Sequence, residues 1–199
     1  MSDKQFHYDV LIVGGGNAAC CAALAALENT PSVGILEKAP KLERGGNSAM
    51  TGHMRYAFNG IDDLRPLVKN MSEDELRKLL DGGLPSRSEA DIWDELMRVT
   101  NNQSDEELLH VHVTESLKTV HWLASKGHDW VPSPATNDNV LSMNGGGMGL
   151  QKRNFDILER AGAHFHYETA ATELIEDQSG RVTGVRALTP GGYAEFHGK

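Results

Sequence analysis

The chain has 199 residues, of which 39% are hydrophobic and 24% charged, as in folded globular proteins and unlike disordered or fibrous ones. Its formal net charge of −9, with no stripe of Lys and Arg, excludes nucleic acid as an expected partner. No apolar run approaches the roughly 20 residues of a membrane span, and no secretory signal precedes residue 10, so we expect a cytoplasmic location and no transmembrane segment.

The N-terminal region has the pattern strand, glycine turn, helix, strand. Residues 8–13 form an apolar run that stops at Gly14-Gly15-Gly16, residues 17–28 favour helix, and residues 32–37 form a second apolar run. Two strands joined by one helix within about 30 residues are typical of the βαβ unit of a parallel sheet. The fold class predicted here is therefore α/β and Rossmann-like.

The turn of this unit carries a dinucleotide fingerprint. The spacing Gly14-x-Gly16-x-x-Ala19 matches GxGxxG/A, in which small residues let the backbone approach a pyrophosphate and let the helix pack closely on the sheet. The helix N-terminus then faces the phosphates with its free N–H groups. Asn17 and Ala18 belong to the same first helical turn, and we include them in the predicted site.

An acidic residue stands where this fingerprint requires one. Glu37 ends the second apolar run, about 20 residues after the glycines, where a carboxylate accepts hydrogen bonds from ribose hydroxyls. A carboxylate at this point also repels a 2′-phosphate, so NADP is disfavoured. These residues by themselves fit either NAD or FAD.

The remainder of the chain divides into a helical stretch and a stretch of short strands. Helical spacing and the capping patterns Ser72-x-x-Glu75 and Ser104-x-x-Glu107 predict a mainly helical lobe. After a glycine-rich return, we expect a helix and then four strands, at residues 149–160, 163–168, 172–176, 181–188 and 193–197. The predicted domains are a nucleotide-binding part (1–59), an inserted lobe (60–143) and a second nucleotide-binding part with a β-meander (144–199).

Cysteines and histidines predict neither disulfide nor metal. Cys20 and Cys21 are neighbours on one helix and point in different directions. His110 and His112 point apart on a helix, and a single pair such as His164 and His166 lacks the third and fourth ligands that a metal site needs.

Several ordered motifs carry a family resemblance. "GGGNAA", "LEKAP", "RGGNSA" and the later "GGG" occur in the order found in the fumarate reductase and succinate dehydrogenase flavoprotein family. The resemblance extends over essentially the whole chain and is strongest to the branch of this family that dehydrogenates tricarballylate. It implies FAD rather than NAD as the cofactor.

The resemblance also implies which residues contact FAD. Besides the glycine turn and Glu37, it places the loop after the second strand near the flavin and a strand backbone near the adenine. The residues are Lys38, Arg44, Gly45, Gly46, Asn47, Ser48, Thr51, Gly147 and Ala171. For Gly147 a hinge role, and for Ser48 and Thr51 a local helix cap, are the alternatives. Asn47 occupies the position of the histidine that tethers FAD in succinate dehydrogenases, so non-covalent FAD is expected, and His53 is not expected to replace it.

Family membership implies an FAD-dependent dehydrogenase or reductase that acts on a carbon–carbon bond beside a carboxylate. The expected partners are a small polycarboxylate such as tricarballylate and an electron acceptor that the resemblance does not identify. Relatives are more than twice as long and carry their catalytic groups further on, so we expect an N-terminal fragment that binds FAD weakly and is inactive alone. The alternatives are a 3-ketosteroid dehydrogenase, an aspartate oxidase, and a non-catalytic or decayed nucleotide-binding fragment.

Overall fold

The computed structural model describes residues 4–52, 54–68, 71–72, 74–75, 87–132 and 141–199. Contacts divide the chain into two compact units, residues 1–50 with 151–199, and residues 51–150. This grouping places residues 51–59 and 144–150, which the sequence assigned to the nucleotide-binding parts, with the second unit. The domain boundaries therefore stay a prediction.

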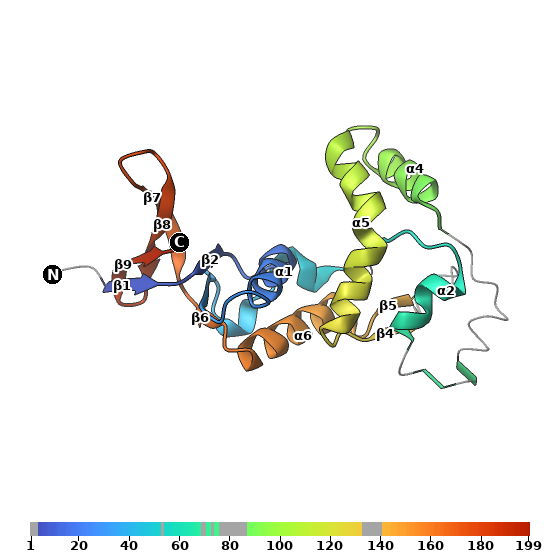
Figure 1. Cartoon of the computed structure of the whole chain (residues 1–199), viewed down its shortest axis with the longest axis horizontal. Helices are drawn as coiled ribbons and strands as arrows, with labels where there is room; N and C mark the ends of the chain where they lie inside the picture. The colour runs from blue at the N-terminus through green and yellow to red at the C-terminus, as the bar shows by residue number, and fades with distance from the viewer. Residues whose placement is uncertain (1–3, 53, 69–70, 73, 76–86, 133–140) are drawn as a thin grey trace. The chain divides into compact units, whose positions relative to one another are not determined.

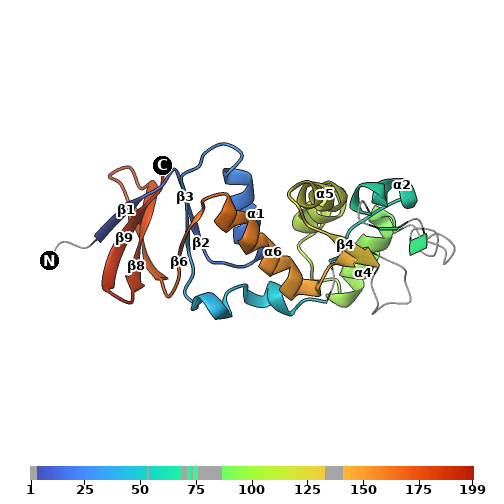
Figure 2. The same cartoon turned by 90° about the horizontal axis from the view of Figure 1, so that it is seen from below.

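The first unit has three layers (Figure 2). A parallel sheet in the order β2-β3-β6 lies between a mixed sheet in the order β1-β9-β8-β7 and the helices α1 and α6. Its helices are α1 (Asn17–Ala26) and α6 (Gly146–Arg160), and the start of α6, up to Leu150, belongs to the second unit. Its strands are β1 (Lys4–His7), β2 (Val10–Val13), β3 (Val33–Leu36), β6 (His164–His166), β7 (Ala170–Glu176), β8 (Val182–Thr189) and β9 (Gly192–His197).

The predicted βαβ unit is present. Strand β2 pairs with β3 in parallel, with Val10 opposite Val33 and Val13 opposite Leu36, and β6 pairs in parallel with the other edge of β3. All four residues of β3 are buried, as expected for an apolar strand in the middle of a parallel sheet. The glycine turn and Glu37 follow β2 and β3, so they lie at the same end of the sheet.

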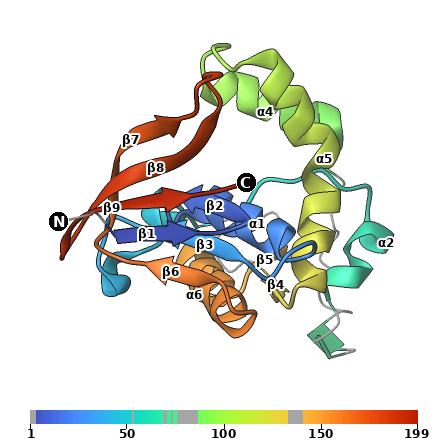
Figure 3. The same cartoon turned by 60° about the vertical axis from the view of Figure 1, so that its left-hand side comes forward.

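The mixed sheet is the predicted β-meander with one added strand. Strands β7, β8 and β9 pair antiparallel in succession, and Figure 3 shows the long β7–β8 hairpin. Strand β1 was not predicted, because "KQFH" is short and mostly polar. It forms by pairing in parallel with β9, with Lys4 opposite Ala194. A partner from the far end of the chain supplies the hydrogen bonds that this segment needs.

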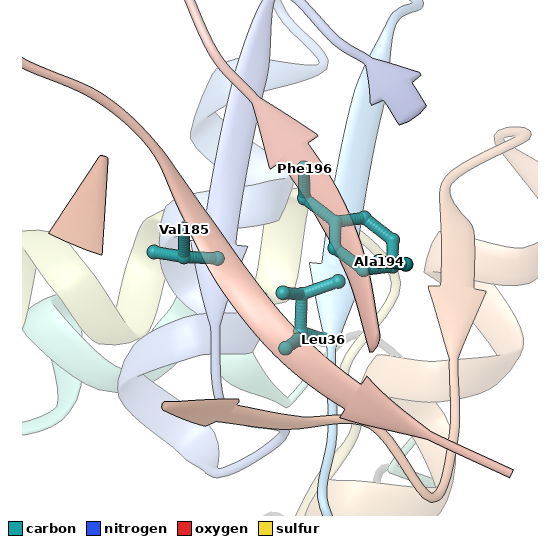
Figure 4. Close-up of a cluster of buried hydrophobic side chains, with 5 residues drawn as sticks. Leu36, Val185, Ala194 and Phe196 are labelled. Atoms are coloured by element: carbon teal, nitrogen blue, oxygen red, sulfur yellow. The ribbon is translucent and has the colours of Figure 1, made fainter. Parts of the chain in front are cut away.

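A buried cluster joins the meander to the parallel sheet (Figure 4). Phe196 on β9 is fully buried, and it lies with Leu36 of β3 and Val185 of β8 in one apolar cluster. Phe6 stacks on the Phe196 ring at a centroid distance of 4.8 Å. Since Leu36 directly precedes Glu37, this packing also fixes the end of β3 that carries the carboxylate.

The second unit is mainly helical, as predicted (Figure 1). Helices α4 (Glu89–Val99) and α5 (Glu106–Ser125) pack together around Ile92 and Val113. Also present are α2 (Ile61–Leu64) with η3 (Arg65–Leu67), and an antiparallel pair, β4 (Trp130–Pro132) and β5 (Leu141–Met143), that the sequence did not predict.

Two predicted helix starts differ in outcome. The Ser72–Glu75 capping box is confirmed, because the Glu75 N–H donates to Ser72 Oγ and the Ser72 N–H donates to Glu75 Oε2. Residues 76–86, on which that helix would continue, lie outside the described residues. Ser104 was the wrong cap for α5. Asp105 caps it by accepting the Leu108 N–H at 3.0 Å.

Helix α6 begins earlier than predicted, at Gly146 rather than Gly149. The Gly147 N–H donates to the carbonyl oxygen of Thr51 at 2.9 Å, so a partner outside the helix satisfies one of the N–H groups that a helix start leaves open.

Candidate functional site

The turn after β2 is tied to the end of β3. Gly14 has φ +106°, a conformation that residues with a Cβ rarely adopt, and its N–H donates to the Leu36 carbonyl oxygen at 2.7 Å. The turn therefore reverses direction beside Glu37.

Gly15 makes room for Glu37. A Cβ on Gly15 would lie 2.6 Å from Glu37 Oε2, closer than a Cβ approaches a non-bonded atom in real structures. The Glu37 side chain is buried, at 8% exposure for the residue, and its Oε1 accepts the Ala39 N–H at 2.8 Å. Gly15 was not among the predicted site residues. The run of three glycines, one more than the fingerprint needs, was the signal that pointed to it.

Gly16 has no structural need to be glycine. Its φ of −76° and ψ of 179° suit any residue, and no atom lies within 4 Å of the position of a Cβ. The Cys20 N–H donates to the Gly16 carbonyl oxygen at 3.0 Å, and the N–H groups before Cys20 have no partner within the helix. A bare backbone, open space and free donors together form a cradle for an anion.

Asn17 is the first residue of α1, and its side chain is turned into the unit. Its Oδ1 accepts a hydrogen bond from Asn154 Nδ2 of α6 at 3.1 Å. The predicted contact of Asn17 with a phosphate can therefore use the backbone N–H, which this side-chain bond leaves unchanged.

The loop after β3 returns to the glycine turn. A Cβ on Gly46 would lie 3.7 Å from the Gly16 Cα, so Gly46 is a close neighbour of the cradle. Gly45 is buried and packs against the side chain of Gln151, whereas Asn47 is exposed and Ser48 is half-buried. The structure thus brings the two glycine motifs together.

Arg44 is held by the protein itself. Its Nη1 donates to Glu159 Oε1 at 2.6 Å and to the hydroxyl of Tyr167, and the guanidinium carbon lies 3.9 Å from the centroid of the Phe155 ring. Its side chain is only 14% exposed. These contacts anchor the loop to α6 and β6, and the predicted contact of Arg44 with the cofactor stays a prediction.

The Arg44–Glu159 pair predicts a pH-dependent contribution to stability. The hydrogen bond from Arg44 holds the pKa of Glu159 below its ordinary value. A carboxyl whose pKa is lowered on folding stabilises the folded state fully at pH values above its ordinary pKa. That contribution is lost as the pH falls through the lowered pKa of the folded state. Glu159→Gln should cost about 1 kcal/mol or less at pH 7 and less at pH 3, measured by urea unfolding at both pH values. An equal cost at both pH values would contradict the assigned charge interaction.

The other predicted residues lie further along the chain. Lys38 is exposed next to Glu37, and Ala171 is exposed on β7, opposite Ala187 of β8. Thr51 and Gly147 belong to the second unit and are joined by the hydrogen bond that begins α6. His53 lies outside the described residues.

The described residues contain neither a metal site nor a membrane-spanning helix. Within the described part of the chain, no group of three or more His, Cys, Asp or Glu residues is placed to hold a metal ion. No helix in that part is both long enough and apolar enough to cross a membrane.

A family model described as an FAD binding domain matches residues 9–199. The chain belongs to this family. The match includes both glycine motifs, Glu37, the lobe and the meander. Matches to fumarate reductases confirm that part of the resemblance, and the α/β FAD-binding fold is confirmed.

Relatives of established function are distant and longer. The chain is 24% identical to digoxin reductase of Eggerthella lenta over 97% of its own length and 34% of that protein. It is 24% identical to a cytochrome-type fumarate reductase of Shewanella frigidimarina over 95% of its length and 31% of that protein. The chain thus spans about a third of the length of these relatives.

Solved structures show the same fold. A flavocytochrome c3 fumarate reductase in an open conformation matches with a TM-score of 0.72 and 20% identity, over 98% of this chain and 32% of that one. A 3-ketosteroid dehydrogenase of Rhodococcus jostii RHA1 matches with a TM-score of 0.63 and 19% identity, over 100% of this chain and 45% of that one.

The residues present fit the FAD that the family binds. The fold does not require a glycine at position 16, and the absence of a side chain there leaves open space. The free N–H groups of the first turn of α1 are the donors that a diphosphate needs. At the end of the neighbouring strand, Glu37 supplies a carboxylate that accepts hydrogen bonds from hydroxyl groups.

Proposed function

We propose that this chain is the nucleotide-binding part of an FAD-dependent oxidoreductase that dehydrogenates a small polycarboxylic acid such as tricarballylate. The observation that carries the proposal is the cradle at Gly16, where bare backbone and free N–H groups face open space beside Glu37. When bound, FAD supplies the hydride acceptor of the reaction.

The residues of this chain bind and orient the cofactor. The N–H groups from Gly16 to Ala19 donate to the phosphates, and the Glu37 carboxylate accepts from the ribose hydroxyls. Gly45 and Gly46 form the neighbouring wall, and Ala171 offers its backbone to the adenine. Asn47 has no nucleophilic side chain, which supports non-covalent binding.

Two observations support a polycarboxylate substrate. Relatives that match 95% of the chain are fumarate reductases, and fumarate is a dicarboxylate. In addition, the motifs "LEKAP" and "RGGNSA" resemble those of the tricarballylate-dehydrogenating branch. An enzyme that works on such a soluble metabolite fits a cytoplasmic location.

A 3-ketosteroid is the second candidate substrate. One structure that matches the whole chain, with a TM-score of 0.63, is a 3-ketosteroid dehydrogenase in complex with 4-androstene-3,17-dione. A steroid is apolar and a tricarboxylate is highly charged, so one assay that offers both distinguishes them.

Cofactor binding is tested by titrating the flavin-free chain with FAD, ADP and NADP and following fluorescence and heat. We expect FAD and ADP to bind and NADP to bind at least about 10-fold more weakly, because Glu37 repels a 2′-phosphate. No saturable binding of FAD up to about 1 mM would overturn the proposal.

The substrate is tested in the protein isolated from its native source. Tricarballylate, succinate and 4-androstene-3,17-dione are each offered with an artificial electron acceptor. We expect the native protein to turn over tricarballylate. We expect the isolated 199 residues to turn over none of the three substrates. Turnover of the steroid alone would replace the polycarboxylate with the second candidate.

A further inference from the structure

One fully buried amide reaches the proposed cradle from α6. Asn154 is 0% exposed, and its Nδ2 donates to Asn17 Oδ1 at 3.1 Å. The two residues are far apart in sequence, so this bond exists only when α6 packs beside α1. It joins the interior of the unit to the first residue of α1.

Packing alone does not account for an amide at this position. Among the described residues, Asn154 Oδ1 is buried and has no hydrogen-bond partner. An unsatisfied buried acceptor costs about 1–3 kcal/mol, so packing alone does not favour a buried amide whose oxygen is unpaired. The Asn154 carboxamide is therefore explained by its NH₂ group, which donates to Asn17 and holds that side chain in place.

The hydrogen bond from Asn154 determines which polar group of the Asn17 side chain remains available to a ligand. A carboxamide has one oxygen that accepts and one NH₂ group that donates. Asn154 Nδ2 occupies the oxygen, and Cys21 Sγ lies 3.9 Å from the same oxygen. No contact with the described residues uses the Asn17 Nδ2 group, which is the half that an anion would bind.

We infer that Asn154 is a positioning residue that holds the Asn17 carboxamide with its oxygen inward, so that Asn17 serves the diphosphate as a donor. This inference rests on the proposed function. The amide NH₂ group joins the free N–H groups of the helix start as a further hydrogen-bond donor, and the opposite orientation would place an oxygen near negative charge. Asn154 acts only through Asn17.

The test is a double-mutant cycle on FAD affinity, combining Asn17→Ala with Asn154→Leu in the full chain. A charge-assisted hydrogen bond lost at Asn17 should weaken FAD binding about 10- to 100-fold. Asn154→Leu alone should weaken it about 5-fold and should have no further effect in the Asn17→Ala background. The Tm of each variant is measured alongside, because Asn154→Leu removes an unpaired acceptor but also leaves Asn17 Oδ1 without its donor.

The outcomes separate the inference from the proposed function. The inference would be overturned if Asn154→Leu weakened FAD binding equally in the wild-type and Asn17→Ala backgrounds, or if Asn17→Ala did not weaken it. Either result would leave the proposed function, FAD binding by this chain, standing. Failure of the wild type to bind FAD would overturn both. Asn154→Ala, which adds no volume, repeats the cycle if the leucine does not fit, and Asp156→Asn, at a half-buried position of α6, is the control.

Discussion

Gly16→Val is expected to weaken FAD binding by at least about 100-fold, or about 2.7 kcal/mol, while the chain stays folded. The valine side chain would fill the open space at the start of α1 and keep the diphosphate away from the free N–H groups. Each charge-assisted hydrogen bond lost in this way is worth about 1.5–3 kcal/mol. Calorimetric or fluorescence titration with FAD measures the effect.

Stability should change little in this variant. The φ of Gly16 is −76°, and no atom lies within 4 Å of the new Cβ, so a valine meets neither strain nor a clash. We expect the free energy of unfolding to change by about 1 kcal/mol or less. Gly191→Val, in the β8–β9 turn, is the matched control and should bind FAD normally. Undiminished FAD binding by Gly16→Val would exclude the cradle as the phosphate site.

Phe196→Ala is expected to have the largest effect on stability, a loss of about 3–5 kcal/mol in the free energy of unfolding. The ring is fully buried between the meander and the parallel sheet, in one cluster with Leu36 (Figure 4). The ring of Phe6 stacks on it. Its removal leaves a cavity that these rigid sheets cannot close. Urea unfolding followed by circular dichroism measures the loss.

Two further variants make this result specific. Tyr193→Ala on the same strand removes a ring that is 49% exposed, so it should cost about 1 kcal/mol or less. Phe196→Leu keeps most of the volume and should cost about 1–1.5 kcal/mol, which keeps the test possible if the alanine variant does not fold. Equal losses at Phe196 and Tyr193 would contradict the assignment of this cluster as the core of the unit.

Local patterns were enough to predict the frame of the first unit. The apolar runs around Gly14, the acidic end of β3 and the turn residues of the meander are short-range signals, and the structure has strands, helix and hairpins at these places. Residue identity also predicted Gly14, because only glycine readily adopts φ +106°. The predicted ends of elements were less accurate, as at α6, where a bond from another segment begins the helix earlier.

The tertiary structure alone decided the contacts between distant segments. Strand β1 exists because β9 pairs with it, Gly15 is needed because the Glu37 carboxylate lies against it, and Arg44 is anchored because Glu159 and Tyr167 surround it. The sequence by itself determined the strand–turn–helix and the acid of the proposed nucleotide site, since those depend on neighbouring residues. Which side chains support that site was decided by folding, because partners such as Asn17 and Asn154 meet only when α1 and α6 pack together.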